Sequence, residues 1–187
     1  MPVAQRLAHI APFYVMEILA HAKALEAAGH DVIHLEIGEP DFPTPAAITQ
    51  AGIAALQAGQ TFYTPALGIP PLRQAIADFY QSRYSITVPA RRVVVTPGAS
   101  GALQLALAAC INPDDKVLLP DPTYPCNRHL VRLVNGEPVC LPVAADSGFQ
   151  LRAEDIATHW DARTVAAMIA SPANPTGTII PAAELEA

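Results

Sequence analysis

An alternation of short apolar runs and helical stretches in the second half of the chain constrains the fold more than any other feature. Apolar runs at residues 93–96, 117–119, 138–141 and 165–170 are separated by stretches with helical spacing at residues 100–110, 127–134 and 153–158. Strands buried on both faces have continuous apolar sequences, and intervening helices allow successive strands to run parallel. The sequence therefore predicts an α/β fold, with a mostly parallel sheet covered by helices on both faces.

The first 90 residues have a different pattern. Helices are predicted at residues 13–28, from about Pro45 to Gly59, and after Pro70-Pro71. In the third helix, one face carries Leu72, Ile76, Phe79 and Tyr80. A strand-like run at 32–35 and loops at 38–45 and 61–68 complete this part, which forms a helical arm before the sheet. At the other end, residues 181–187 predict a helix that is only starting, so the sequence is expected to stop partway through a domain.

Composition excludes several classes of function. The chain has 187 residues, of which 51% are hydrophobic, and this is enough for the core of one domain. The net charge of −6, with acidic and basic residues mixed, argues against nucleic acid and membrane surfaces as partners. Three cysteines without a paired spacing indicate reduced thiols. Because no signal peptide or membrane-spanning run is found, we expect a cytoplasmic protein.

The loops that follow strands are where an open α/β sheet binds its ligands. The first such loop, Pro-Gly-Ala-Ser-Gly-Ala at residues 97–102, opens a helix. Its small residues let backbone N–H groups approach an anion, the helix dipole favours the negative charge, and Ser100 adds a hydroxyl. This pattern suits a phosphate, although small residues also permit tight packing of strand and helix. Neither a dinucleotide fingerprint nor a P-loop is present.

Two further loops have unusual chemistry. Tyr124 stands between prolines in Asp-Pro-Thr-Tyr-Pro at residues 121–125, where its ring could stack on a planar heterocycle or cap the edge of the core. Asn174 opens Asn-Pro-Thr-Gly at 174–177. Its amide could donate to an oxygen of a bound ring, and the same four residues could equally form a plain turn.

Together, five motifs in a fixed order give the chain a family resemblance. They are Gly-Glu-Pro-Asp-Phe at 38–42, Tyr-Thr-Pro-Ala-Leu-Gly at 63–68, Pro-Gly-Ala-Ser-Gly-Ala-Leu at 97–103, and the two loops at 121–125 and 174–177. From about Val32 to its end the chain resembles the fold-type I enzymes that use pyridoxal 5'-phosphate (PLP), specifically the class I/II aminotransferases. The resemblance implies a partial large domain of the three-layer PLP-transferase fold.

The resemblance also implies roles for individual residues. The backbone of Ala99 and the hydroxyl of Ser100 would hold the PLP phosphate, Tyr124 would stack on the pyridine ring, and Asn174 would bind the phenolic oxygen of that ring. Many relatives have Trp at the position of Tyr124, so this residue does not identify a substrate. Gly38 would contact the substrate carboxylate through its backbone.

Other family features concern a second subunit and a second half. Tyr63 would reach the phosphate of the neighbouring subunit in a homodimer. The family's Schiff-base lysine, the aspartate that pairs with the pyridine nitrogen and the arginine that grips the substrate lie in its second half. Neither Lys23, in the first helix, nor Lys116, at the start of a strand, has the context of that lysine. No catalytic residue is therefore predicted, and the chain alone is expected to be inactive.

The expected function is that of the amino-terminal part of an aminotransferase, which transfers an amino group between an amino acid and a 2-oxo acid. Alternatives are a PLP-dependent lyase of the same fold, and a catalytically dead, truncated homologue that acts as a binding module. Residues 1–40 are predicted to form an N-terminal arm and the start of a small domain, and residues 41–187 an incomplete PLP-binding large domain. In the family's sheet order the strand at 93–96 is separated from the fourth strand. It is therefore expected either to close onto that strand or to leave an edge that pairs with a second copy.

Overall fold

A computed structural model describes residues 2–187 of the chain. The chain divides into two compact units. Unit 1 consists of Leu103–Ala187 together with the N-terminal residues up to Tyr14, and unit 2 is Val15–Ala102. The predicted boundary between a small and a large domain at residue 40 stays a prediction.

Unit 1 contains a parallel three-stranded sheet. Its strands are β1 (Lys116–Asp121), β2 (Glu137–Pro142) and β3 (Thr164–Ala167), in the order β2-β1-β3. Leu118 of β1 lies opposite Val139 of β2 and Ala167 of β3. The register between β1 and β3 shifts between Lys116 and Val117. The predicted parallel arrangement of these three strands is confirmed.

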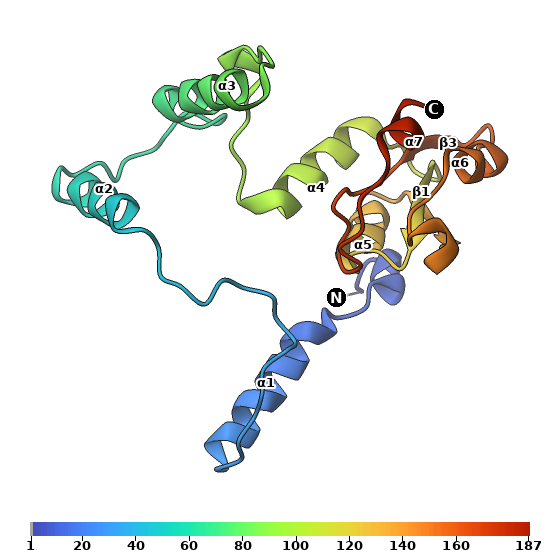
Figure 1. The fold of residues 1–187 in the computed structure, drawn as a ribbon, viewed down its shortest axis with the longest axis horizontal. Coiled ribbons are helices and arrows are strands. Elements are labelled where there is room, and N and C mark those ends of the chain that lie inside the picture. Colours follow the sequence, from blue (N-terminus) through green and yellow to red (C-terminus); the bar gives the residue numbers. More distant parts are fainter. Residues whose placement is uncertain (1) are drawn as a thin grey trace. The chain divides into compact units, whose positions relative to one another are not determined.

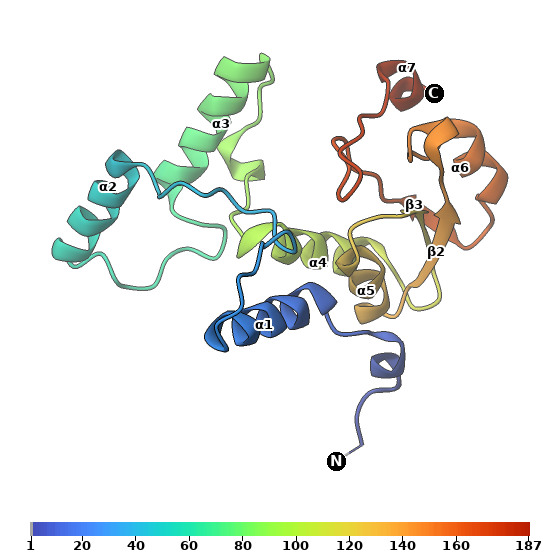
Figure 2. The same cartoon turned by 60° about the horizontal axis from the view of Figure 1, so that its bottom comes forward.

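Helices connect the strands, as parallel pairing requires: α5 (Cys126–Leu133) lies between β1 and β2, and α6 (Ala153–His159) between β2 and β3. α4 (Gly98–Cys110), which begins in unit 2 and ends in unit 1, precedes β1, and α7 (Ala182–Glu186) follows β3. Short 3₁₀ turns, η1 (Gln5–His9) and η3 (Ala145–Ser147), complete unit 1. In both views the strands lie between α5 and α6 (Figure 1, Figure 2). The helices predicted in this part are confirmed, with α4 beginning two residues before Ser100.

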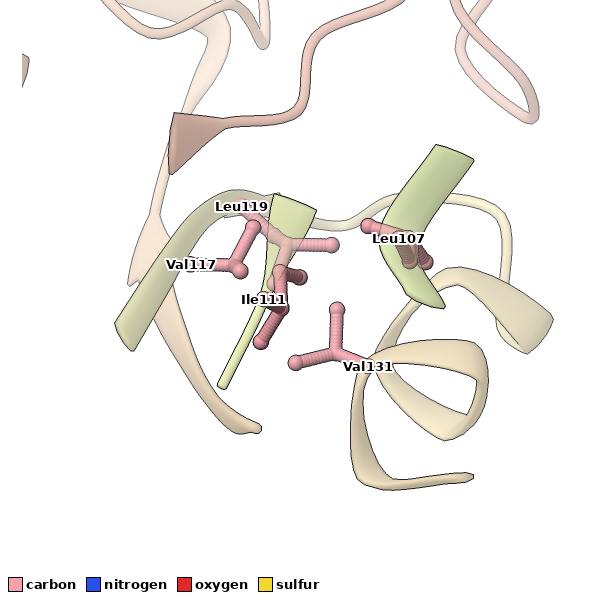
Figure 3. Close-up of a cluster of buried hydrophobic side chains, with 5 residues drawn as sticks. All are labelled: Leu107, Ile111, Val117, Leu119 and Val131. Atoms are coloured by element: carbon pink, nitrogen blue, oxygen red, sulfur yellow. The ribbon is translucent and has the colours of Figure 1, made fainter. Parts of the chain in front are cut away.

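The core of unit 1 lies on both faces of β1, because successive side chains of a strand point to opposite faces. On one face Val117 and Leu119 pack against Leu107 of α4, Val131 of α5 and Ile111. Figure 3 shows these five side chains gathered around one point. On the other face Leu118 packs with Leu141 and Leu151. Each fully buried side chain of this kind stabilises the fold by about 1.5–3 kcal/mol. Because Ile156 of α6 packs against this second cluster, helices cover both faces of the sheet, and unit 1 is a three-layer α/β/α arrangement.

Unit 2 is helical. It contains α1 (Tyr14–Ala27), whose first residue belongs to unit 1, then α2 (Ala46–Gln57), α3 (Pro70–Tyr84) and the 3₁₀ turn η2 (Ala90–Arg92). All three predicted helices are confirmed, with Pro45 immediately before α2 rather than in its first turn. The face predicted on α3 is open, since Leu72, Phe79 and Tyr80 are exposed.

The prediction of two strands in unit 2 is wrong. Residues 32–35 and 93–96 form no strand in the described structure, and residues 93–96 do not join β3 to make a fourth strand. The backbone of this second segment is held instead by Val95 N, which donates to Leu67 O at 3.0 Å, and by Arg73 Nε, which donates to Val93 O at 2.9 Å. An apolar run becomes a strand only where a neighbouring strand pairs with it, and none of the described residues does so here.

Candidate cofactor site

Two of the predicted site residues follow neighbouring strands of unit 1. Tyr124 lies in the loop after β1, which ends at Asp121, and Asn174 lies in the segment after β3, which ends at Ala167. Because β1 and β3 are paired and parallel, both loops leave the carboxyl edge of the sheet. Open α/β sheets bind their ligands at this edge. The placement of Tyr124 and Asn174 in loops after strands agrees with the sequence prediction.

The loop that carries Tyr124 is closed at its base. Arg128 Nη2 donates to Asp121 Oδ1 at 3.1 Å and so joins α5 to the last residue of β1. Within the loop, Asn127 N donates to Tyr124 O at 3.0 Å, and Asn127 Nδ2 donates to Thr123 Oγ1 at 3.4 Å. These contacts fix the backbone from which the Tyr124 ring projects.

The Tyr124 ring has an aromatic partner that the sequence did not indicate. Phe13 meets it edge-on, with ring centroids 5.9 Å apart and an interplanar angle of 66°. A hydrogen bond with Cys126, together with burial, raises the pKa of Tyr124, so its phenol stays neutral at physiological pH. Because Phe13 is distant in sequence, only the folded chain reveals this contact. The ring is thus held from one side.

The loop that carries Asn174 is a compact turn. Ala173 N donates to Thr178 O at 2.9 Å, Gly177 N donates to Ala173 O at 2.8 Å, and Ile180 N donates to Ser171 Oγ at 3.0 Å. The expected turn chemistry is therefore present. Asn174 itself is exposed at this turn, where its amide is free to meet a ligand.

The predicted phosphate loop lies in unit 2, at the start of α4. Gly98 has φ +74°, a conformation that favours glycine, and Thr96 Oγ1 donates to Gly98 O at 2.9 Å. A Cβ at Gly101 would stand 3.1 Å from Pro97 Cδ, so glycine lets the turn pack closely. Ala99 and Ser100 are exposed in the first turn of a 13-residue helix. Exposed N–H groups and a hydroxyl at a helix start suit an anion.

Gly38 and Tyr63 are also exposed in unit 2. No side chain lies within 4 Å of a Cβ built on Gly38, so its backbone is accessible. Tyr63 is fully exposed in its loop. The structure does not test their predicted roles, which concern a substrate and a second subunit.

Lys116 lies at the opposite edge of the sheet from Tyr124. It is the first residue of β1, and its Nζ is 2.6 Å from Asp161 Oδ2. The hydrogen bond from Lys116, followed by one from the backbone of Arg163, lowers the pKa of Asp161 to about 2. Lys116 is therefore committed to an ion pair at the amino end of the strand.

In unit 1, the aromatic ring of Tyr124 suits stacking on a planar heterocycle, and the Asn174 amide suits an oxygen of such a ring. In unit 2, the helix N–H groups and the Ser100 hydroxyl suit a phosphate. Residues 2–187 contain no group of three or more His, Cys, Asp or Glu that could hold a metal ion. Across the same residues, none of the helices has both the length and the apolar character needed to cross a bilayer.

Comparisons with known proteins all identify the same family. Residues 30–187 match the family model described as aminotransferase class I and II. The chain is 41% identical over 180 residues to a valine–pyruvate aminotransferase of Mycobacterium tuberculosis, covering 96% of this chain and 46% of the relative. It is 40% identical over 184 residues to a probable aspartate/prephenate aminotransferase of Aquifex aeolicus, covering 98% and 47%. The chain thus spans about half the length of the curated relatives it matches.

Solved structures of aminotransferases have the same fold over the length of this chain. A crystal structure of an aminotransferase from Mycobacterium tuberculosis has a TM-score of 0.92 at 40% identity, with 99% of this chain and 47% of that chain covered. The aspartate aminotransferase of Thermus thermophilus with maleate has a TM-score of 0.94 at 32% identity, with 100% and 49% covered. These similarities confirm the predicted fold class.

Proposed function

Because the chain belongs to the class I and II aminotransferases, we propose that it forms the phosphate-binding and ring-stacking part of a PLP-dependent aminotransferase. The reaction would transfer an amino group between an amino acid and a 2-oxo acid. The observation that carries the proposal is the position of Tyr124 and Asn174 in loops at the carboxyl edge of paired strands. A structural core alone does not require an exposed amide and an aromatic ring at this edge.

Each residue has a task that follows from its chemistry. Ala99 N–H and Ser100 Oγ bind the phosphate, aided by the dipole of α4. Tyr124 stacks on the ring and, because its phenol stays neutral, adds no charge there. Asn174 donates to the ring's phenolic oxygen and so orients the ring in its plane. When bound, PLP supplies an electron sink for bonds at the substrate's α-carbon.

The remaining roles complete the proposal. Gly38 offers its backbone to the substrate carboxylate, and Tyr63 reaches the phosphate site of a second copy in a homodimer. The exposure of both residues supports these roles. The ion pair of Lys116 at the amino end of β1 supports the view that Lys116 does not form the Schiff base. Lys23 lies in α1, outside the loops that follow the strands, and is likewise not assigned this role, so residues 1–187 alone are proposed to be inactive.

The test is a PLP titration of the chain at its full natural length, followed by absorbance, with Ser100→Ala as the variant. The variant loses a hydrogen bond to a charged group, which contributes about 1.5–3 kcal/mol. Its Kd for PLP should therefore rise about 10- to 100-fold. Ser82→Ala is the matched control, because the Ser82 hydroxyl donates to Phe79 O within α3. Equal Kd values for S100A, S82A and the unchanged chain would contradict the proposed phosphate site.

A product assay separates the reaction classes. An aminotransferase forms a new amino acid only when a 2-oxo acid is supplied, and the amounts of the two products match. Turnover of the amino acid without any 2-oxo acid would indicate a lyase instead. PLP binding without either reaction at full natural length would favour a binding module.

A further inference from the structure

A buried amide joins the two ends of the loop that carries Asn174. Gln150 is 3% exposed, and its Nε2 lies 3.0 Å from Thr178 O, 3.0 Å from Thr178 Oγ1 and 3.4 Å from Ala170 O. Ala170 precedes the turn and Thr178 follows it, so one side chain from outside the loop holds both of its ends.

The same amide begins a short chain of hydrogen bonds within the loop. Because Gln150 Nε2 can only donate, Thr178 Oγ1 accepts from it, and the same hydroxyl shares a second hydrogen bond with Thr176 Oγ1 at 2.9 Å. Thr178 O accepts from Ala173 N as well as from Gln150. Ala173 and Thr176 flank Asn174 and its following proline. The anchor thus acts on residues on both sides of Asn174.

Gln150 is itself held firmly. It follows Gly148 and Phe149, which have φ values of +61° and +55°, and Phe149 N donates to Ala144 O at 2.8 Å. The next residue, Leu151, is buried against Leu118 of β1. Gln150 therefore transmits the position of the sheet core to the loop.

We propose that Gln150 is a positioning residue for the cofactor: it holds the loop 170–178 so that the Asn174 amide is aimed at the ring oxygen before PLP binds. The inference rests on the proposed function, because Asn174 is taken as the ring-oxygen ligand. Without the anchor, PLP binding would have to order the loop, and part of the binding free energy would be lost.

Gln150→Met is the informative variant. It keeps the length and most of the volume of the side chain but removes the donor. Gln150 Oε1 is buried without a hydrogen-bond partner among the described residues, so its removal offsets part of the cost of losing the donor. A large loss of global stability is therefore not expected. Gln81→Met is the matched control, since Gln81 is an exposed glutamine that accepts a hydrogen bond from Thr87 Oγ1 at 2.7 Å in unit 2.

The experiment has two readouts on the chain at its full natural length. Hydrogen exchange without PLP measures the loop itself, and Q150M is expected to speed exchange of the Ala173 and Gly177 amides about tenfold. PLP titration measures the consequence, and Q150M is expected to raise Kd about tenfold. Q81M should change neither value.

A double-mutant cycle with Asn174→Ala separates positioning from a general structural role. If Gln150 acts through Asn174, Q150M should raise Kd less than about twofold in the N174A background. An equal rise in both backgrounds, or unchanged exchange at Ala173 and Gly177, would overturn the proposal. Absence of PLP binding by the unchanged chain would overturn the proposed function instead, while hydrogen exchange would still report the anchor.

Discussion

Units 1 and 2 differ in what covers their apolar side chains. In unit 1, β1 buries Val117, Leu118 and Leu119 completely between layers that its own helices supply. In unit 2, α2 has an apolar sequence but no buried residue, and Ile53 is 41% exposed. A local apolar pattern therefore determines the type of element, but burial requires a second layer, which unit 2 does not supply for α2.

The largest expected difference between the two units is in the free energy of unfolding that a truncated apolar side chain costs. Leu119→Ala removes a fully buried side chain and should lower the free energy of unfolding by about 2–5 kcal/mol. Ile53→Ala truncates an exposed residue in a helix and should cost less than about 1 kcal/mol. Urea denaturation followed by circular dichroism measures both. Equal losses would show that α2 is as well covered as β1.

The same difference explains how much of the fold could be predicted from sequence. β1, β2 and β3 were predicted within a few residues, because their apolar runs pair with one another inside the chain. Residues 93–96 have an equally apolar run but form no strand, since pairing is decided by a neighbouring segment and not by the run itself.

The residues of the candidate site also differ in whether a local sequence signal marks them. The placement of Tyr124 and Asn174 in loops after strands could be predicted, because strand ends and turn residues mark these loops locally. Phe13 and Gln150 could not, because their contacts join segments far apart in the chain. The only local signal for Gln150 is an amide between Phe149 and Leu151, which hints at burial but names no partner.

A smaller effect, on the Kd for PLP, is expected when an aromatic contact is removed from unit 1 but not when one is removed from unit 2. Phe13→Leu removes the edge-on partner of Tyr124, and such pairs contribute about 0.5–1.5 kcal/mol beyond the buried area. The Kd for PLP should rise by about two- to tenfold. Phe79→Leu is the control, because Phe79 has aromatic partners, Tyr80 and Tyr84, in unit 2. If F79L weakens PLP binding as much as F13L, the contact has no special role.

The smallest expected effects concern two charged residues, Asp161 and His34, whose ionic contacts have opposite pH dependence. The folded pKa of Asp161 is about 2, below its ordinary 3.8, so the Lys116 pair stabilises unit 1 above pH 4 and this contribution is lost as the pH falls toward 2. Asp161→Asn should therefore lower Tm slightly at pH 7, with a difference from the unchanged chain that narrows below pH 4. A difference that is constant with pH would contradict this assignment.

In unit 2, His34 contacts two carboxylates, and its contribution to stability has the opposite pH dependence. Hydrogen bonds with Glu36 and then Glu26 raise the pKa of His34 above 6.5. Its contribution is complete below pH 6.5 and is lost as the pH rises through the folded pKa. His34→Gln should lower Tm slightly at pH 6, and the difference should fade in alkaline solution. A difference that grows with pH would show that the pair does not stabilise the folded state.

The most direct test of the account is a crystal structure of the chain at its full natural length with PLP. We predict the phosphate at the start of α4, within hydrogen-bond distance of Ala99 N and Ser100 Oγ, because local N–H groups and the helix dipole outweigh distant carboxylates. The pyridine ring should lie against Tyr124, with Asn174 Nδ2 bonded to its phenolic oxygen. PLP bound elsewhere, with the start of α4 empty in the same crystal, would contradict the account.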